Sequence, residues 1–452
     1  MKSLVSVASL WAAVSAFALT PTVSNVTISQ DDARKVHVAY TLAGAPAIVT
    51  VDLYTNDVCI SKFVSTVTGD GNCLVAANGS HEMVWKVRKD WPDRTTKLAN
   101  AVRAEVRAHH PSNPPDVIVM NLAENSDPAV NYYASVGSLP GGLLENDDYR
   151  ISKLVVKKCP VKYRTFMLGA PINSVGRENG WDVERSVTFT NDYYMGVFEL
   201  TGGQWDSLMG ARHNQIFGSA ANDRWKVRPL SHVSHADMRE TGDRTRFDDA
   251  YRYPHSPSAD SFFGKLYART GLRCDLPSAA QWEVACDCGR MYGWYGRHSV
   301  TNVDDDIGFR GENGYDYIGR YKYNGGNVRN GDGSYSVPAE DCDFSQGTAK
   351  VGSYEPNAWG FYDMFGNLVE KVLDDKQGSN YSNAYDVHGE AFVDGTTSGT
   401  DRSIAAKGGA QWNSGVGHGA ATCGWGGPKG DNQHAGCRVM YRVNQAGYYS
   451  DL

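Results

Sequence analysis

Apolar and polar residues alternate along four short runs near the start of the chain, and this pattern restricts the fold of that region more than any other feature does. An extended strand points successive side chains to opposite faces, so each run buries one face and exposes the other. Polar turns such as TGDGN separate the runs, which predicts an antiparallel β-sandwich over residues 19–115. The four runs are KVHVAYTL (35–42), AIVTVDLYT (47–55), HEMVWKVR (81–88) and AVRAEVRAH (101–109).

A proline-rich break, HHPSNPPD at 109–116, ends the strand-rich region and marks the expected domain boundary. Residues 116–160 are expected to form a linker with one lead-in strand. Residues 161–445 are rich in aromatic residues and glycine, and residues 446–452 are expected to be a tail. The chain holds 48 glycines in 452 residues, which exceeds the average share of about 7%. These patterns predict an α+β protein in which a β-sandwich precedes an irregular, loop-rich domain.

Three helices are expected in the second region, because capping residues flank runs with apolar residues at helical spacing. Ser and Thr favour the position before a helix, and Gly favours the position after it. Long segments without regular structure lie between these helices, so aromatic packing, metal ions or disulfides are expected to hold the loops in place. The expected helices are 199–210, which opens near Thr201, 260–270, which ends before Gly271, and a third that begins after Ser278.

The first residues, MKSLVSVASLWAAVSAFALT, have the organisation of an export signal. Lys2 supplies a positive charge, Leu4 to Val14 form an apolar stretch, and Ala16-Phe17-Ala18 resembles a cleavage site. The sequence therefore predicts a signal peptide at residues 1–18 and a protein that is secreted, periplasmic or held at the cell surface. A buried N-terminal helix is the alternative. No later run reaches the ~18 apolar residues that a membrane span needs, so no transmembrane segment is expected.

The net charge argues against some classes of partner, and the cysteine count limits the disulfides that the chain can form. The formal net charge is −7 and there is no basic block, which argues against nucleic acid and anionic membranes as partners. Export would permit disulfides, but nine cysteines leave at least one unpaired within a monomer. Spacing suggests that Cys59 and Cys73 bridge a hairpin and that Cys423 and Cys437 close a glycine-rich loop. The sequence alone does not fix this connectivity.

From residue 161 onward the chain resembles, segment by segment, the domain family of the formylglycine-generating enzyme, or sulfatase-modifying factor. The strongest match is VGSYEPNAWGFYDMFGNLVE (351–370), and Glu199, Thr201 and Trp205 stand where the family has an E-V-T-x-x-x-W helix. The resemblance covers residues 160–445 and implies an irregular, C-type-lectin-like α+β fold. The other similar segments are YRTFMLGA (163–170), RPLSHVSHADM (228–238), DLPSAAQWEVAC (275–286), AKGGAQWN (406–413) and GCRVMYRV (436–443).

The resemblance also implies a loss or change of chemistry. Formylglycine-generating enzymes hold copper between two cysteines that follow a Gly-Gly motif, because soft thiolates suit Cu(I). After Gly408-Gly409 this chain has Asn413 and His418 at the two cysteine positions, so a bis-thiolate copper site is not expected. Iron-dependent sulfoxide synthases of the family draw their histidine ligands largely from a helical domain, whereas the N-terminal region here reads as strands. Copper and iron are therefore not expected, and no catalytic residue is assigned.

The segment PNAWGFYDMFGNLVEKV (356–372) is expected to form a structural calcium site. The equivalent turn in the family binds calcium, and the matching positions are the side chains of Asp363 and Glu370 and the carbonyls of Gly366 and Leu368. Calcium takes six to eight oxygens that mix carboxylates with carbonyls, and glycine permits the backbone to turn them inward. The alternative is a core turn in which Glu370 is exposed or forms a salt bridge.

Three classes of function are compatible with these features. The first is an exported, non-catalytic binding or scaffold protein with a calcium-stabilised domain. Residues 408–436 would form its ligand face, with Trp412, Trp425 and Asn432 contacting an extracellular glycan, peptide or protein. The second is an oxygen-dependent metalloenzyme of the same family with an altered active centre. The third is a structural surface or assembly protein that forms oligomers.

Overall fold

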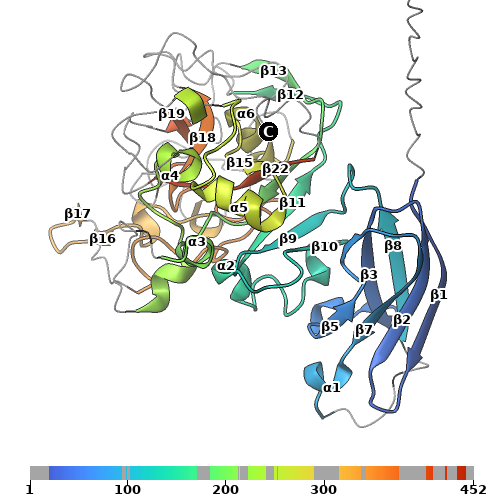
Figure 1. The fold of residues 1–452 in the computed structure, drawn as a ribbon. Helices are drawn as coiled ribbons and strands as arrows, with labels where there is room; N and C mark the ends of the chain where they lie inside the picture. Colours follow the sequence, from blue (N-terminus) through green and yellow to red (C-terminus); the bar gives the residue numbers. More distant parts are fainter. Residues whose placement is uncertain are drawn as a thin grey trace, which may run out of the picture.

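The computed structural model shows a β-sandwich joined to a larger α+β body (Figure 1). The expected signal peptide and the expected tail lie outside the described residues. The α+β fold class predicted from the sequence is confirmed, and no helix among the described residues is long and apolar enough to cross a membrane. The structure describes residues 20–93, 98, 102–169, 184–211, 213, 222–240, 249–251, 253–289, 315–336, 343–375, 404–410, 423–424 and 435–443.

The sandwich consists of two antiparallel sheets that pack face to face (Figure 1). Burial in β2 alternates along the strand, and its buried residues belong to the same hydrophobic core as Trp85 of the neighbouring strand β7. Each of the four alternating runs forms a strand, so this prediction is confirmed. One sheet has the order β1 (Thr22–Gln30), β2 (Val36–Ala43), β7 (Gly79–Trp85) and β5 (Val67–Gly69), and the second pairs β3 (Ala47–Thr55) with β4 (Val58–Cys59), β6 (Cys73–Val75) and β8 (Val102–His109).

Cys59 and Cys73 do not form the expected disulfide, and both are free thiols. Both β4 and β6 pair with β3, where Cys59 lies opposite Tyr54 and Cys73 lies opposite Val49. These positions are five residues apart along one strand, which corresponds to roughly 17 Å at ~3.4 Å per residue. A disulfide needs Cα atoms within about 7 Å of each other, so this register excludes the bond.

A six-stranded sheet forms the centre of the larger body, and three of its strands lie within the expected linker. The prediction that residues 116–160 are a linker with one strand is therefore wrong. Ile118 and Met120 of β9 face one buried cluster, while Val117 and Val119 face another. Because both faces of β9 are buried, its sequence does not alternate between apolar and polar residues. The strand order is β10 (Val130–Tyr133), β9 (Val117–Asn121), β11 (Lys153–Cys159), β14 (Tyr193–Gly196), β22 (Met440–Arg442) and β15 (Cys274–Asp275).

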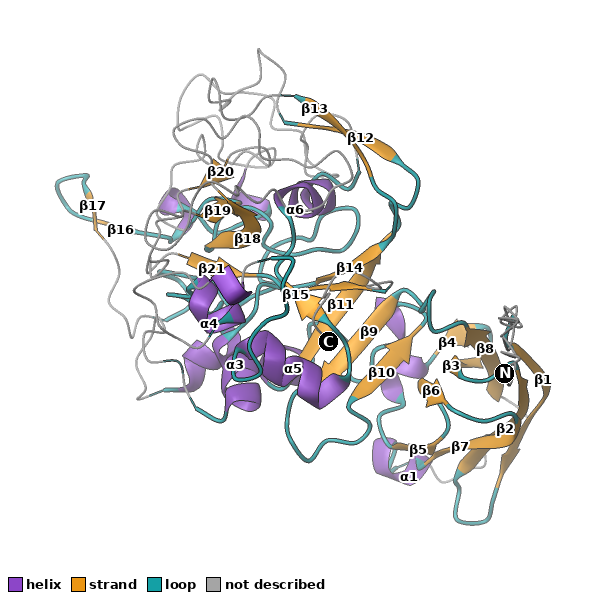
Figure 2. Ribbon diagram, turned by 45° about the horizontal axis from the view of Figure 1, so that its top comes forward, coloured by secondary structure: helices purple, strands orange, loops and turns teal. Residues whose placement is uncertain are grey.

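The three predicted helices are present, and the first and third begin at the predicted caps, Thr201 and Ser278. Thr201, Ser261 and Ser278 each accept a hydrogen bond from the backbone N–H three residues later. Gly271 ends the second helix in the left-handed conformation. In Figure 2, α3 and α5 lie along the central sheet. The helices are α1 (Val87–Asp90), α2 (Asp148–Ile151), α3 (Gly202–Met209), α4 (His235–Arg239), α5 (Phe262–Thr270) and α6 (Ala279–Cys286).

A second, four-stranded sheet lies beside α6, and two hairpins complete the described strands (Figure 2). Cys423 and Cys437 lie on its two outer strands, β20 and β21, which are separated by two further strands. At ~4.8 Å per strand they are about 14 Å apart, so the second expected disulfide does not fit either. The strands are β20 (Cys423–Gly424), β19 (Ile404–Lys407), β18 (Val369–Asp375) and β21 (Ala435–Cys437), with hairpins β12 (Thr165–Leu168)–β13 (Arg185–Thr188) and β16 (Val328–Arg329)–β17 (Tyr335–Ser336).

Two arginine side chains hold the irregular segment 343–348 in place. Arg228 donates to the carbonyl oxygens of Thr348 and Asp343, and Arg320 donates to those of Phe344 and Ser345. Both arginines are buried. A guanidinium carries five N–H donors in a fixed plane, so one side chain satisfies several loop carbonyls at once.

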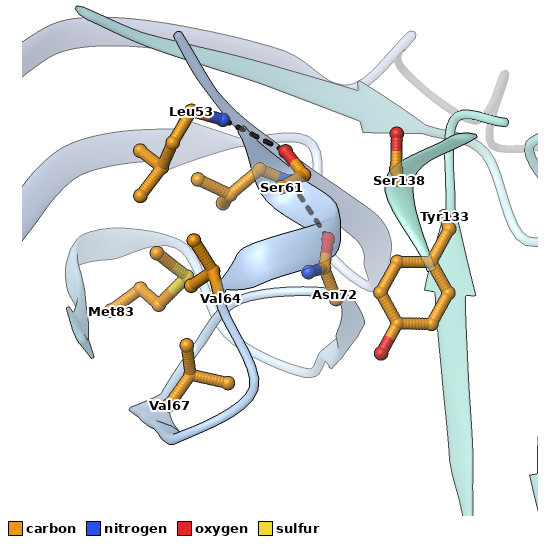
Figure 3. Close-up of a pocket in the computed structure, with 9 residues that line it drawn as sticks. Leu53, Ser61, Val64, Val67, Asn72, Met83, Tyr133 and Ser138 are labelled. Carbon is orange, nitrogen blue, oxygen red and sulfur yellow. Dashed lines mark hydrogen bonds between the residues drawn. The ribbon is translucent and has the colours of Figure 1, made fainter. Parts of the chain in front are cut away.

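The sandwich and the larger body meet along β10. Tyr132 N donates to the carbonyl oxygen of Asn72 at 2.9 Å, and Gly141 N donates to that of Lys62 at 2.6 Å. A cavity of about 10 Å³ lies at this junction (Figure 3). That volume is about enough for one water molecule, so the cavity is too small for an organic ligand. Its lining residues are Val51, Leu53, Ser61, Val64, Val67, Asn72, Met83, Tyr133 and Ser138.

Candidate functional site

The turn at Gly366, expected from the sequence to bind calcium, is buried and tightly fixed. Asp363, Gly366 and Asn367 have φ angles of 54°, 70° and 56°, in the left-handed region that favours glycine. A Cβ on Gly366 would lie 2.0 Å from the carbonyl oxygen of Arg320. Gly366 N donates to the carbonyl of Gly408 and Asn367 N to that of Arg320, each at 2.8 Å. Only glycine fits at position 366 in this arrangement.

Three buried carboxylates converge on the turn. Glu199, Asp363 and Glu370 are 0%, 1% and 1% exposed. Asn367 Nδ2 donates to Glu199 Oε2 at 2.7 Å, and Leu368 N donates to Glu199 Oε1 at 3.1 Å. Asp363 Oδ2 accepts a 2.6 Å hydrogen bond from a backbone N–H. Glu199 lies three residues after the end of β14, so its hydrogen bonds tie the turn to the central sheet.

Arg438 forms an ion pair with Glu370 inside the body. Its Nη2 lies 2.7 Å from Glu370 Oε1, and its Nε lies 3.0 Å from Oε2. Trp282 Nε1, from α6, donates to the same Oε2 at 2.8 Å. Such paired guanidinium–carboxylate bonds are among the strongest in proteins. The salt-bridged alternative for Glu370 is therefore what the structure shows, with Arg438 as its partner.

Burial and charge shift the proton affinities of this cluster. Burial, and then the charges of Asp363 and Glu370, hold the pKa of Glu199 well above its usual range. Burial likewise raises the pKa of Asp363 to about 6, although a backbone hydrogen bond and Arg438 oppose the change. Burial acts to lower the pKa of Arg438, but Glu370 and the other carboxylates outweigh it and raise that pKa overall. The buried site therefore favours the protonated form of Glu199 and the charged form of Arg438.

The donor set does not fit the calcium cradle that the sequence suggested. Calcium needs six to eight oxygen ligands, yet both oxygens of Glu370 already accept hydrogen bonds from Arg438 and Trp282. Asp363 Oδ1 is buried and has no hydrogen-bond partner among the described residues, so it supplies one free oxygen. Within the described part of the chain, no three His, Cys, Asp or Glu side chains form a group that could hold a metal ion.

The expected copper positions and ligand-face residues lie outside the described residues. These are Asn413, His418, Trp412, Trp425 and Asn432. Strands on either side of them are described, and residues 405–410 and 435–442 are all buried. Segment 411–422 therefore follows a buried strand, and segment 425–434 precedes one.

A buried ion pair anchors the strand that leads into the first of these segments. Lys407 Nζ lies 3.1 Å from Glu283 Oε2, and both side chains are fully buried. Gly408 follows, and a Cβ there would lie 3.0 Å from the ring of Trp282. The Gly408 backbone therefore packs directly against the Trp282 ring, and this contact fixes the direction in which the chain leaves β19.

Five cysteines of the larger body are buried free thiols: Cys159, Cys274, Cys286, Cys288 and Cys437. Burial raises the pKa of Cys159, Cys274, Cys286 and Cys437. Thiolates, not thiols, bind copper, so these four side chains are poor ligands. Cys437 Sγ instead lies 3.8 Å from the sulfur of Met238 in the apolar core.

The sequence did not identify the partners of the turn. Glu199 was recognised only as part of a helix-leading motif, and Arg438 and Trp282 were given no role. A signal was present, because Arg438 interrupts the apolar run AGCRVMYRV and Glu199 interrupts MGVFEL. A charged residue in a buried strand needs a partner of opposite charge, but the sequence does not say which one.

This chain is similar to several proteins of solved structure. PvdO from Pseudomonas aeruginosa is 18% identical, with a TM-score of 0.45 over 64% of this chain and 94% of that one. Treponema denticola variable protein 1 is 16% identical, with a TM-score of 0.42 over 64% and 95%. CarF is 13% identical, with a TM-score of 0.36 over 64% and 99%. No curated protein matches the sequence.

The family assignment rests on a sequence model rather than on these structures. The model of the sulfatase-modifying factor enzyme 1-like domain matches residues 152–443, which is more than half of the chain. The match starts at β11 and ends after β22, so it includes Glu199, the Gly366 turn and Arg438. The chain belongs to the sulfatase-modifying factor enzyme 1-like family.

Proposed function

We propose that this chain is an exported, non-catalytic binding protein, in which the family framework presents residues 408–436 to a ligand. The observation that supports the proposal is that segment 411–422 follows the buried residues 405–410 and that segment 425–434 precedes the buried residues 435–442. Loops held by a rigid framework are where proteins of many folds place their binding residues. The ligand class is an extracellular glycan, peptide or protein.

The side chains in these two segments suit binding. They include Trp412, Trp425 and Asn432 among many glycines and serines. Aromatic rings supply large contact areas at a low cost in conformational entropy, and small polar residues adapt their hydrogen bonds. Asn413 and His418 stand where the family resemblance places the two thiolates of the copper site, and Cys159, Cys274, Cys286 and Cys437 are buried thiols with raised pKa values.

Binding can be tested on a glycan array and with a random-peptide display library. The full-length protein is compared with the Trp412→Ala/Trp425→Ala variant and with Tyr163→Ala. Tyr163 is 77% exposed and lies outside the proposed face, so it controls for loss of an exposed aromatic ring. We expect the double variant to lose binding without a change in melting temperature, and Tyr163→Ala to keep it. Binding that survives the double substitution would contradict the proposed face.

A further inference from the structure

Two aromatic rings and three cations lie together on the surface of the β-sandwich, outside the residues that the family model matches. Phe63 is 48% exposed, and its ring centre lies 6.5 Å from that of Trp91. Lys62, Arg88 and Lys89 are exposed on the two helical segments that bear these rings. We propose that these five residues, the Phe63 platform, bind an acidic polysaccharide that bears carboxylate or sulfate groups.

Hydrogen bonds hold the two helical segments of the Phe63 platform against each other. The 3₁₀-helix η1 (Ser61–Phe63) carries the first ring, and Trp91 follows α1 directly. Asp90, the last residue of α1, accepts hydrogen bonds from Ser65 N at 2.8 Å, Ser65 Oγ at 2.5 Å and Thr66 N at 3.1 Å. Figure 2 shows α1 beside β5 at the surface of the sandwich. The platform is therefore built by two segments that the fold locks together.

A buried tryptophan supports the rings from below. Trp85 is 0% exposed, and its ring centre lies 5.1 Å from that of Trp91 with an angle of 79° between the planes. Trp85 Nε1 also donates to Asp90 Oδ2 at 2.8 Å. Rings that are already fixed lose little conformational entropy when a ligand binds, so this support favours binding.

The charges around the rings are positive, in contrast to those of the whole chain. The formal net charge of the chain is −7, yet segments 60–66 and 86–93 contain four cations and two acids. Asp90 accepts the hydrogen bonds described above, which leaves Asp93 as the acid exposed to solvent. The three cations of the Phe63 platform form no ion pair with an acidic side chain among the described residues. The four cations are Lys62, Lys86, Arg88 and Lys89.

The chemistry of the Phe63 platform matches a sugar that carries a negative charge. Lys62 Nζ lies 5.0 Å from the centre of the Phe63 ring, so a ligand on this ring meets an apolar surface and a positive charge together. The C–H groups of a sugar pack on aromatic rings, and carboxylate or sulfate oxygens pair with Lys and Arg. An acidic polysaccharide offers both kinds of group in each repeat.

The other polyanions that a cell presents fit this surface less well. Proteins that bind duplex DNA commonly contact about 6–10 phosphates, and the platform has three cations. Stable attachment to an anionic membrane takes a second anchor, such as a lipid chain, in addition to a basic patch. One or two sugar units, in contrast, suffice to occupy two rings and three cations.

Three polymers that share one backbone test the proposal. The full-length protein is passed over immobilised dextran, dextran sulfate and carboxymethyl-dextran in a surface plasmon resonance instrument. We expect binding to at least one acidic dextran and none to neutral dextran, and we expect the affinity to fall as NaCl screens the exposed charges. Which acidic dextran binds more tightly identifies sulfate or carboxylate as the preferred group. Equal binding to all three, binding to none, or tighter binding to duplex DNA or phosphatidylserine vesicles would overturn the proposal.

Two variants separate the contribution of the ring from that of the charges. Phe63→Ser removes an apolar contact, and Arg88→Ser/Lys89→Ser removes two exposed charges, so each should weaken binding to the acidic dextran about tenfold or more. The matched control is Tyr54→Ser/Arg103→Ser, because the Arg103 guanidinium lies 4.2 Å from the Tyr54 ring on the other sheet. This control should bind as the unmodified protein does. Full binding by Phe63→Ser would refute the platform and indicate simple ion exchange.

Melting temperatures show whether each variant is folded. Should Phe63→Ser fail to fold, Arg88→Ser/Lys89→Ser changes only exposed positions of α1, and unchanged binding by that variant would also refute the proposal. The Trp412→Ala/Trp425→Ala variant should keep its affinity for the acidic dextran. Binding that survives this double substitution but is lost in Phe63→Ser belongs to the Phe63 platform, so the outcomes for the two proposed surfaces are distinguishable.

Discussion

Replacing Gly366 by alanine should destabilise the larger body far more than the same change at another glycine with the same backbone angle. Gly366 and Gly271 both have φ of 70°. The alanine Cβ would lie 2.0 Å from the Arg320 carbonyl oxygen at position 366, but nothing lies within 4 Å of it at position 271. Only the first substitution therefore forces the backbone to move.

The magnitude follows from these contacts. Left-handed backbone costs a non-glycine residue roughly 1–2 kcal/mol, and this cost is common to both variants. At Gly366 the clash adds about 1–3 kcal/mol of strain, and loss of the bond from Asn367 N to Arg320 adds about 1 kcal/mol. We expect Gly366→Ala to lower the free energy of unfolding by about 3–6 kcal/mol and Gly271→Ala by about 1–2 kcal/mol.

Urea unfolding followed by tryptophan fluorescence measures both values. The difference between the two variants is the informative quantity, because the shared backbone cost cancels. Equal losses at the two positions would show that the turn at Gly366 is not packed against Arg320, and the description of the site would then be wrong.

Three further predictions concern residues outside the turn. Lys407→Met should cost about 3–5 kcal/mol, because it leaves Glu283 buried without its 3.1 Å partner, and adding Glu283→Gln should restore part of the loss in urea unfolding. Burial beside two cations lowers the pKa of His109, so the folded state keeps it neutral. Its contribution to stability is complete above about pH 6.5 and declines as pH falls below that value, and His109→Gln should flatten the fall in melting temperature. Ser278→Ala should cost about 1 kcal/mol, because Gln281 N loses its capping acceptor; a loss below ~0.3 kcal/mol would argue against the cap.

Local features of the fold could be predicted because they follow from short-range chemistry. The alternation in β2, the caps at Thr201 and Ser278 and the glycine at position 366 are all visible within a few residues. Each depends only on the local backbone conformation or on exposure to solvent, and residues a few positions apart are enough to satisfy it.

Features that depend on contacts between distant segments could not be predicted, because neighbouring residues carry no information about those contacts. β9 has both faces buried against elements far along the chain, so its continuous apolar run VIVMN gave no alternation. Sequence spacing also does not reveal that Arg438 meets Glu370, 68 residues away, or that Arg150 meets Val351, 201 residues away. The predicted disulfides do not fit because strand order and register, not separation along the chain, decide which cysteines lie close together.

The central claim is that this chain keeps the family framework but not its copper–thiolate chemistry. The most direct test is to load the purified protein with copper, add a cysteine-containing peptide and oxygen, and examine the peptide by mass spectrometry. We predict that the cysteine remains unmodified and that oxygen uptake stays at the level without protein. Conversion of the cysteine to formylglycine would contradict the account.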